Sequence, residues 1–164
     1  MKIVSVFAFL VLCASARAQY VLRTLDQRWE GICLVAVVEV GPVTEVSTPQ
    51  GLLLQSETAK IKQLVYRRFK PLEGESADDI TIYSFMPSGL EVACPAPLTL
   101  KSGPAFVMMA MQGMNKFYPS DPWEFQPLEK DFLLWPAAKG IEERSLKDVI
   151  AEISAYAAKH PHQN

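Results

Sequence analysis

Apolar and polar positions alternate along much of this chain in the two-residue rhythm of β-strands. The clearest strand is Ile32–Val40, a run rich in β-branched residues that Gly41 and Pro42 end. Its apolar residues fall on both alternating faces, which predicts that both faces are covered over part of its length. Further strands are expected over Asp79–Phe85, Ala105–Met111 and, as the last strand, Asp131–Pro136.

The stretch over 51–66 permits two interpretations. Ala59 and Ile61 alternate with polar neighbours, as in a half-exposed strand. The alternation slips at Leu64–Val65, where a β-bulge would restore it. A helix over 57–69 is the competing prediction, because Lys, Gln, Arg and Glu are good helix formers. We favour the strand, which brings the expected total to five.

The spacing of apolar residues changes to three and four near the end of the chain. Ser145 and Asp148 resemble a capping box, with Asp in place of the usual Glu or Gln. The apolar positions that follow are Leu146, Val149, Ile150, Ile153, Tyr156 and Ala157. This pattern predicts an amphipathic helix over about 145–159 that ends at His160–Pro161.

An aromatic segment over 115–127 contains three prolines, so it cannot form a regular helix. Its aromatic residues are Phe117, Tyr118, Trp123 and Phe125. Aromatic side chains on a stiff loop make good anchors for a protein partner. The alternative is that these rings plug one end of a barrel. We therefore expect a long loop that either binds a partner or packs over the fold.

The N-terminus has the three-part layout of a secretory signal. Lys2 is followed by the apolar run Ile3–Leu12 and then by small residues up to Ala18. The run is about half of the roughly 20 residues that span a bilayer. We expect cleavage after Ala18, or alternatively after Ala16, which makes the protein secreted or periplasmic. Residues 19–164 then form a single domain with no membrane span.

Charge and composition exclude some functions. Removing residues 1–18 takes away two basic residues and no acidic one, so the formal net charge changes from −2 to −4. A mildly acidic chain without a basic stripe is a poor candidate for binding nucleic acid. No motif in the sequence calls for a cofactor. The basic residues Arg67, Arg68 and Lys70 could contact an anion, but a solvated strand edge is the simpler interpretation.

Two cysteines, Cys33 and Cys94, remain after the expected cleavage. An even count in an oxidising compartment favours a disulfide. The enclosed loop of about 60 residues would contribute roughly 4 kcal/mol in the chain-entropy model. The alternative is two unpaired buried thiols.

No group of residues in the sequence points to catalysis or to a metal site. His160 and His162 lie close to the C-terminus, where a solvated tail is expected. A serine hydrolase would have to take its general base from this tail. A thiol enzyme needs a free, activated cysteine, which the expected disulfide removes. The chain is therefore predicted not to be an enzyme, with no catalytic or metal-ligating residue.

Three segments resemble a known family. Ile32–Val40 is similar to its opening apolar strand, Ile61–Gly74 to a long strand that leads into a basic-glycine turn, and Cys94 with Leu100–Met109 to a cysteine, a glycine turn and an apolar strand. Over roughly residues 30–111 the chain thus resembles small exported bacterial proteins whose OB-fold barrel is like that of tissue inhibitors of metalloproteinases and netrin modules. The resemblance implies an OB-like five-stranded barrel, here with a C-terminal amphipathic helix.

The expected mature N-terminus departs from those inhibitors. They begin with Cys-x-Cys, whose first amino group and carbonyl chelate the protease zinc, whereas this chain would begin Gln19-Tyr20-Val21. The resemblance therefore implies the fold and not the inhibition. An exported, non-catalytic binding module is the favoured function. The alternatives are a protease inhibitor that acts without the zinc-binding cysteine and, least favoured, an exported hydrolase.

Overall fold

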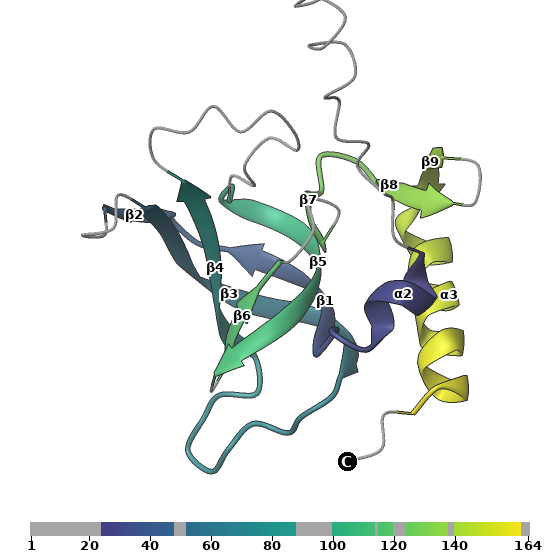
Figure 1. Cartoon of the computed structure of the whole chain (residues 1–164), viewed down its shortest axis with the longest axis horizontal. Coiled ribbons are helices and arrows are strands. Elements are labelled where there is room, and N and C mark those ends of the chain that lie inside the picture. The colour runs from purple at the N-terminus through teal and green to yellow at the C-terminus, as the bar shows by residue number, and fades with distance from the viewer. Residues whose placement is uncertain are drawn as a thin grey trace, which may run out of the picture.

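The computed structural model describes residues 24–47, 52–87, 100–113, 115–119, 124–137 and 140–161. In chain order the elements are α2 (Leu25–Trp29), β1 (Leu34–Val40), β2 (Thr44–Ser47), β3 (Leu52–Arg67), β4 (Asp79–Pro87), β5 (Gly103–Gly113), β6 (Lys116–Tyr118), β7 (Phe125–Pro127), β8 (Phe132–Ala137), β9 (Gly140–Ser145) and α3 (Leu146–Lys159). Figure 1 shows a barrel of strands beside a layer made of α2, α3 and the β8–β9 hairpin.

Five strands close the barrel. Strand β1 pairs with β3, β3 with β4, β4 with β6, β6 with β5, and β5 pairs again with β1. The β4–β6 pair is parallel and the other four pairs are antiparallel. This order matches a five-stranded OB-like barrel, so the predicted fold class with its C-terminal helix is confirmed.

The strand prediction over 51–66 is confirmed, and the competing helix is wrong. Strand β3 is 16 residues long and pairs with β1, β2 and β4. Against β1, Tyr66 pairs with Val35 and Leu64 with Ala36, so Val65 is left out of the ladder. This irregularity is the bulge expected at Leu64–Val65.

The fifth barrel strand is not the one that the sequence pattern indicates. The run over 131–136 is a strand, but β8 pairs with β9 in a separate two-stranded sheet. The barrel is closed by β6, which lies inside the segment predicted to be a long loop. A strand of three residues is too short to show a two-residue period, and β4, whose parallel pairing with β6 closes the barrel, is distant in sequence.

Apolar side chains form one core inside the barrel and a second core on its outer face. Because successive side chains of a strand point to opposite faces, β1 places Leu34 in the inner core and Val35 in the outer core. Both are fully buried, which confirms the prediction that this strand is covered on both sides. The outer core consists of Trp29, Ile32, Val35, Phe106, Met108, Leu133, Trp135, Val149 and Ile153.

Helix α3 covers the outer core and follows the predicted bounds closely. The Ser145 hydroxyl accepts a hydrogen bond from the Asp148 N–H at 3.1 Å, which caps the first turn. Val149 and Ile153 are completely buried on the face that meets the barrel. In Figure 1 the helix runs along one side of the barrel, with α2 between them.

Candidate functional site

The structure separates the aromatic residues that the sequence groups as partner anchors. Phe117 and Phe125 are each 2% exposed and belong to the inner core. They pair with Met111 and Val107 of β5, and this pairing turns both rings into the barrel. Both rings therefore pack inside the barrel, as the alternative interpretation expects, and neither is an exposed anchor; their part in binding a partner stays a prediction. Tyr118 is half-buried.

Two residues of the predicted sites lie outside the described residues. Trp123 is one of them, so its place in the aromatic segment is not described. Cys94 is the other. Its expected partner Cys33 is buried in the inner core, with its thiol 3.8 Å from the carbonyl oxygen of Gly31. The Cys33–Cys94 disulfide stays a prediction.

An apolar hollow lies at the end of the barrel where the β3–β4 loop meets the β5–β6 turn. We call it the barrel-end hollow, and its volume is about 290 Å³. Its lining residues are Arg67, Phe69, Lys70, Pro71, Leu72, Glu75, Met111, Asn115 and Phe117. Three large apolar side chains form its rim, because Phe69 is 42% exposed, Leu72 56% and Met111 36%.

Asn115 holds the β3–β4 loop in place beside the hollow. Its side-chain nitrogen donates to the carbonyl oxygens of Ser76 at 2.9 Å and Asp79 at 3.1 Å. The backbone carbonyl oxygen of Asn115 accepts a hydrogen bond from the Thr81 N–H at 2.9 Å. The residue has φ +52°, a left-handed conformation that Asn adopts more readily than most side chains. The loop is therefore tied to the barrel at several points.

Arg67 crosses the same region from the end of β3. Its guanidinium donates to the Ala77 carbonyl oxygen at 2.7 Å and to the Asn115 side-chain oxygen. It also lies 5.8 Å from the centre of the Phe117 ring, within the range of a cation–π contact. Partial burial lowers the pKa of Arg67, and the negative charges of Glu75 and Asp78 act in the opposite direction and raise it. Arg67 thus links the loop to the floor of the hollow.

The loop also makes its own hydrogen bonds. The Ser76 hydroxyl accepts from the Asp78 and Asp79 N–H groups at 3.2 and 3.0 Å. A Glu75 carboxylate oxygen accepts from the Leu72 N–H at 2.9 Å, and the Glu75 N–H donates to the Leu72 carbonyl oxygen at 3.0 Å. These bonds fix the backbone of Leu72 while its side chain stays exposed.

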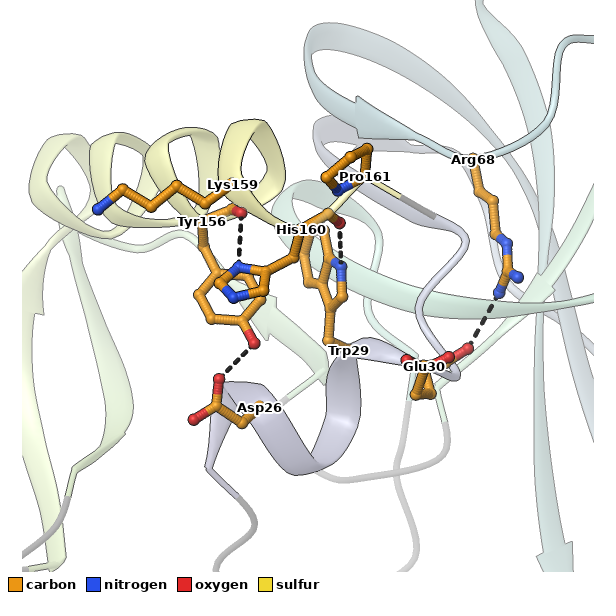
Figure 2. Close-up of a pocket in the computed structure, with 8 residues that line it drawn as sticks. All are labelled: Asp26, Trp29, Glu30, Arg68, Tyr156, Lys159, His160 and Pro161. Atoms are coloured by element: carbon orange, nitrogen blue, oxygen red, sulfur yellow. Dashed lines mark hydrogen bonds between the residues drawn. The ribbon is translucent and has the colours of Figure 1, made fainter. Parts of the chain in front are cut away.

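A second hollow, more polar and about 590 Å³ in volume, lies between α2 and the end of α3. Figure 2 shows its lining residues Asp26, Trp29, Glu30, Arg68, Tyr156, Lys159, His160 and Pro161. The His160 ring stacks on Tyr156 with centroids 4.1 Å apart, and the Trp29 indole N–H donates to the His160 carbonyl oxygen at 3.1 Å. Arg68 donates to the Glu30 carbonyl oxygen at 3.1 Å. These contacts join α2, α3 and the segment after β3.

Tyr156 should make the fold sensitive to alkaline pH. Its hydroxyl donates to Asp26, and this bond, followed by burial and by the charges of Asp26 and Glu30, raises the pKa of Tyr156 from 10.0 to about 12. Since the folded state holds the proton more tightly, this stabilisation is complete below pH 10 and is lost as the pH rises through about 12. Denaturant titrations at a series of pH values would measure this. The free energy of unfolding of the native chain should fall more steeply between pH 10 and about 12 than that of Tyr156→Phe. Parallel profiles would contradict this prediction.

The contacts in the polar hollow are of the kind that hold a terminal helix to a fold. The apolar rim of the barrel-end hollow differs, because much of the surface of its side chains faces solvent; the Arg68 guanidinium lies 5.3 Å from the centre of the Phe69 ring. The sequence identifies Arg67 and Lys70 in this region but not Phe69 or Leu72. Two large apolar residues inside the otherwise polar stretch over 68–79 are the signal that could have found them.

Within the described ranges, no helix is both long enough and apolar enough to cross a membrane. The same residues contain no cluster of three or more His, Cys, Asp or Glu side chains placed to hold a metal ion. Comparison with family models, with curated proteins and with solved structures finds no match to this chain. The resemblance to inhibitor and netrin modules stays a prediction.

Proposed function

We propose that this chain is an exported, non-catalytic binding module that holds a protein partner at the barrel-end hollow. The observation that carries the proposal is the exposed apolar rim of Phe69, Leu72 and Met111 around a single hollow. Apolar side chains that gather at the surface are typical of interaction sites. Export is supported by the signal-like pattern over residues 1–18.

The order of the loop supports binding. Asn115 and Arg67 hold the far end of the loop through hydrogen bonds to the carbonyls of Ser76, Ala77 and Asp79, and Glu75 is hydrogen-bonded to the Leu72 backbone. A preorganised loop loses less conformational entropy when a partner covers it, so more of the contact energy is available as affinity. The Leu72 side chain is thus exposed on a hydrogen-bonded backbone, in a loop whose far end is tied to the barrel.

The chemistry of the lining also supports binding over catalysis. The titratable residues of the barrel-end hollow are Arg67, Lys70 and Glu75, and Glu75 is bonded to its own loop. Its described lining includes no Ser, Thr, Cys or His side chain, the types that supply most nucleophiles and many general bases. The proposal accordingly assigns no catalytic residue and no cofactor.

Leu72→Glu should abolish capture of the partner. The tagged mature chain would be used to capture exported proteins of its native host, with identification by mass spectrometry. A buried leucine contributes roughly 1.5–3 kcal/mol, and a carboxylate at the same place adds a desolvation cost, so capture should fall at least about tenfold. Leu72 is 56% exposed in the free protein, so the fold should tolerate the change.

Leu64→Glu is the matched control. Leu64 is 51% exposed on β3 and does not line the hollow, so this variant should capture the partner as well as the native chain. Equal capture by Leu72→Glu and the native chain would count against the proposal. A protease as the captured protein would favour the inhibitor function of the same site.

A further inference from the structure

The size and shape of the barrel-end hollow indicate what kind of ligand fits it. Its volume of about 290 Å³ lies at the lower limit of the roughly 300–1,000 Å³ typical of small-molecule pockets. Phe69 and Leu72 also stand around the opening with much of their surface in solvent. A ligand enclosed in the hollow would leave this rim uncovered, whereas a protein segment would insert one large side chain and cover the rim with its neighbours.

The charges around the hollow indicate what lies next to that side chain. Lys70 lines the hollow, is exposed, and forms no ion pair with any described carboxylate. Arg67 adds a second positive charge at the wall, where it is bonded to carbonyl and amide oxygens. Glu75 is the one acidic residue among the described lining, and one of its oxygens accepts from the Leu72 N–H. The available charge at the rim is therefore the positive charge of Lys70.

From these observations we infer that the occupant, given the binding function proposed above, is a protein segment that inserts a large apolar side chain and pairs an adjacent Asp or Glu with Lys70. The apolar side chain would lie against Phe117 and Met111, and its neighbours would cover Leu72 and Phe69. An exposed ion pair of this kind contributes little affinity but discriminates between partners by charge. The protein should therefore bind segments with an acidic residue beside the apolar side chain in preference to segments with a basic one.

Four synthetic peptides test this inference directly. They share capped Gly-Ser flanks and differ in their centres, which are Glu-Phe-Glu, Ser-Phe-Ser, Lys-Phe-Lys and Glu-Ala-Glu. Each would be titrated into the isotope-labelled mature chain while the amide signals of Phe69, Leu72 and Met111 are followed by NMR. At low salt the Glu-Phe-Glu peptide should bind about tenfold more tightly than Lys-Phe-Lys, with Ser-Phe-Ser between them. Glu-Ala-Glu should leave these signals unchanged because it lacks the apolar anchor.

Lys70→Glu should reverse the order of the charged peptides. The matched control is Lys62→Glu, which changes an exposed lysine on β3 that does not line the hollow and should leave the order as it is. High salt should reduce the difference between the charged peptides, since screening weakens exposed charge pairs.

Two results of the peptide titrations would overturn the inference. Equal affinity for all three Phe peptides would show that charge plays no part, and the absence of any shift at the rim would show that such segments do not bind there. In either case the proposed binding function is judged separately, by whether Leu72→Glu abolishes partner capture. If Leu72→Glu leaves both capture and peptide binding unchanged, the function and the inference are both wrong.

Discussion

Phe117→Ala is expected to destabilise the protein by about 3–5 kcal/mol, the usual cost of removing a buried phenylalanine ring. Phe117 is 2% exposed, and its strand β6 pairs with both β4 and β5. The ring fills the inner core at the point where the barrel closes, and Arg67 lies over it. Removing the ring would leave a cavity inside the barrel and take away the main apolar contact of a three-residue strand.

Denaturant unfolding monitored by circular dichroism would measure this loss. Phe117→Leu keeps most of the volume and should cost less than about 1.5 kcal/mol, so it gives a value even where Phe117→Ala fails to fold. Tyr118→Ala on the same strand is a second control, with a smaller expected loss because Tyr118 is half-buried. A loss below about 1 kcal/mol for Phe117→Ala would contradict the buried role and favour the surface role, the other of the two that the sequence allows.

The two interpretations of Phe117 show which part of the fold the sequence determines clearly. Strand β1 is predictable because seven consecutive residues carry one pattern, and its burial on both faces follows from apolar residues at odd and even positions. Strand β6 offers a single inward ring among prolines and polar residues. It pairs with Met111 across a short turn, but it closes the barrel through its parallel pairing with Ile82 of β4, which local sequence does not reveal. Closure of the barrel by this strand was therefore not predictable.

The candidate site was less predictable than the fold, for the same physical reason. Phe69 and Leu72 belong to a loop, whereas Met111 belongs to β5, more than thirty residues later. They meet where the loop folds back over the end of the barrel, and the Asn115 side chain ties that loop to the β5–β6 turn through the carbonyls of Ser76 and Asp79. A side-chain contact over such a separation leaves no periodic signal. The sequence marks the charges Arg67 and Lys70 but not the exposed Phe69 and Leu72 beside them.

The outer layer has an anchor of its own in Trp29. The indole is 3% exposed, and its centroid lies 4.7 Å from that of Tyr66 on β3 and 5.1 Å from that of Tyr156 on α3. Its N–H donates to the His160 carbonyl oxygen, which ties α2 to the end of α3 (Figure 2). One side chain thus contacts the barrel and both helices.

Trp29→Ala should therefore lower the free energy of unfolding by about 3–5 kcal/mol. Local opening of α3 should become easier than opening of the barrel strands. Hydrogen exchange would measure this, with amides of α3 losing more protection than those of β1 and β5. Trp29→Phe keeps an aromatic ring between Tyr66 and Tyr156 but removes the N–H donor, so its loss should be nearer 1 kcal/mol. Equal loss of protection in α3 and in the barrel would contradict a separately anchored layer. In that case both cores would unfold as one unit, and the barrel-end hollow would depend on the helix it does not touch.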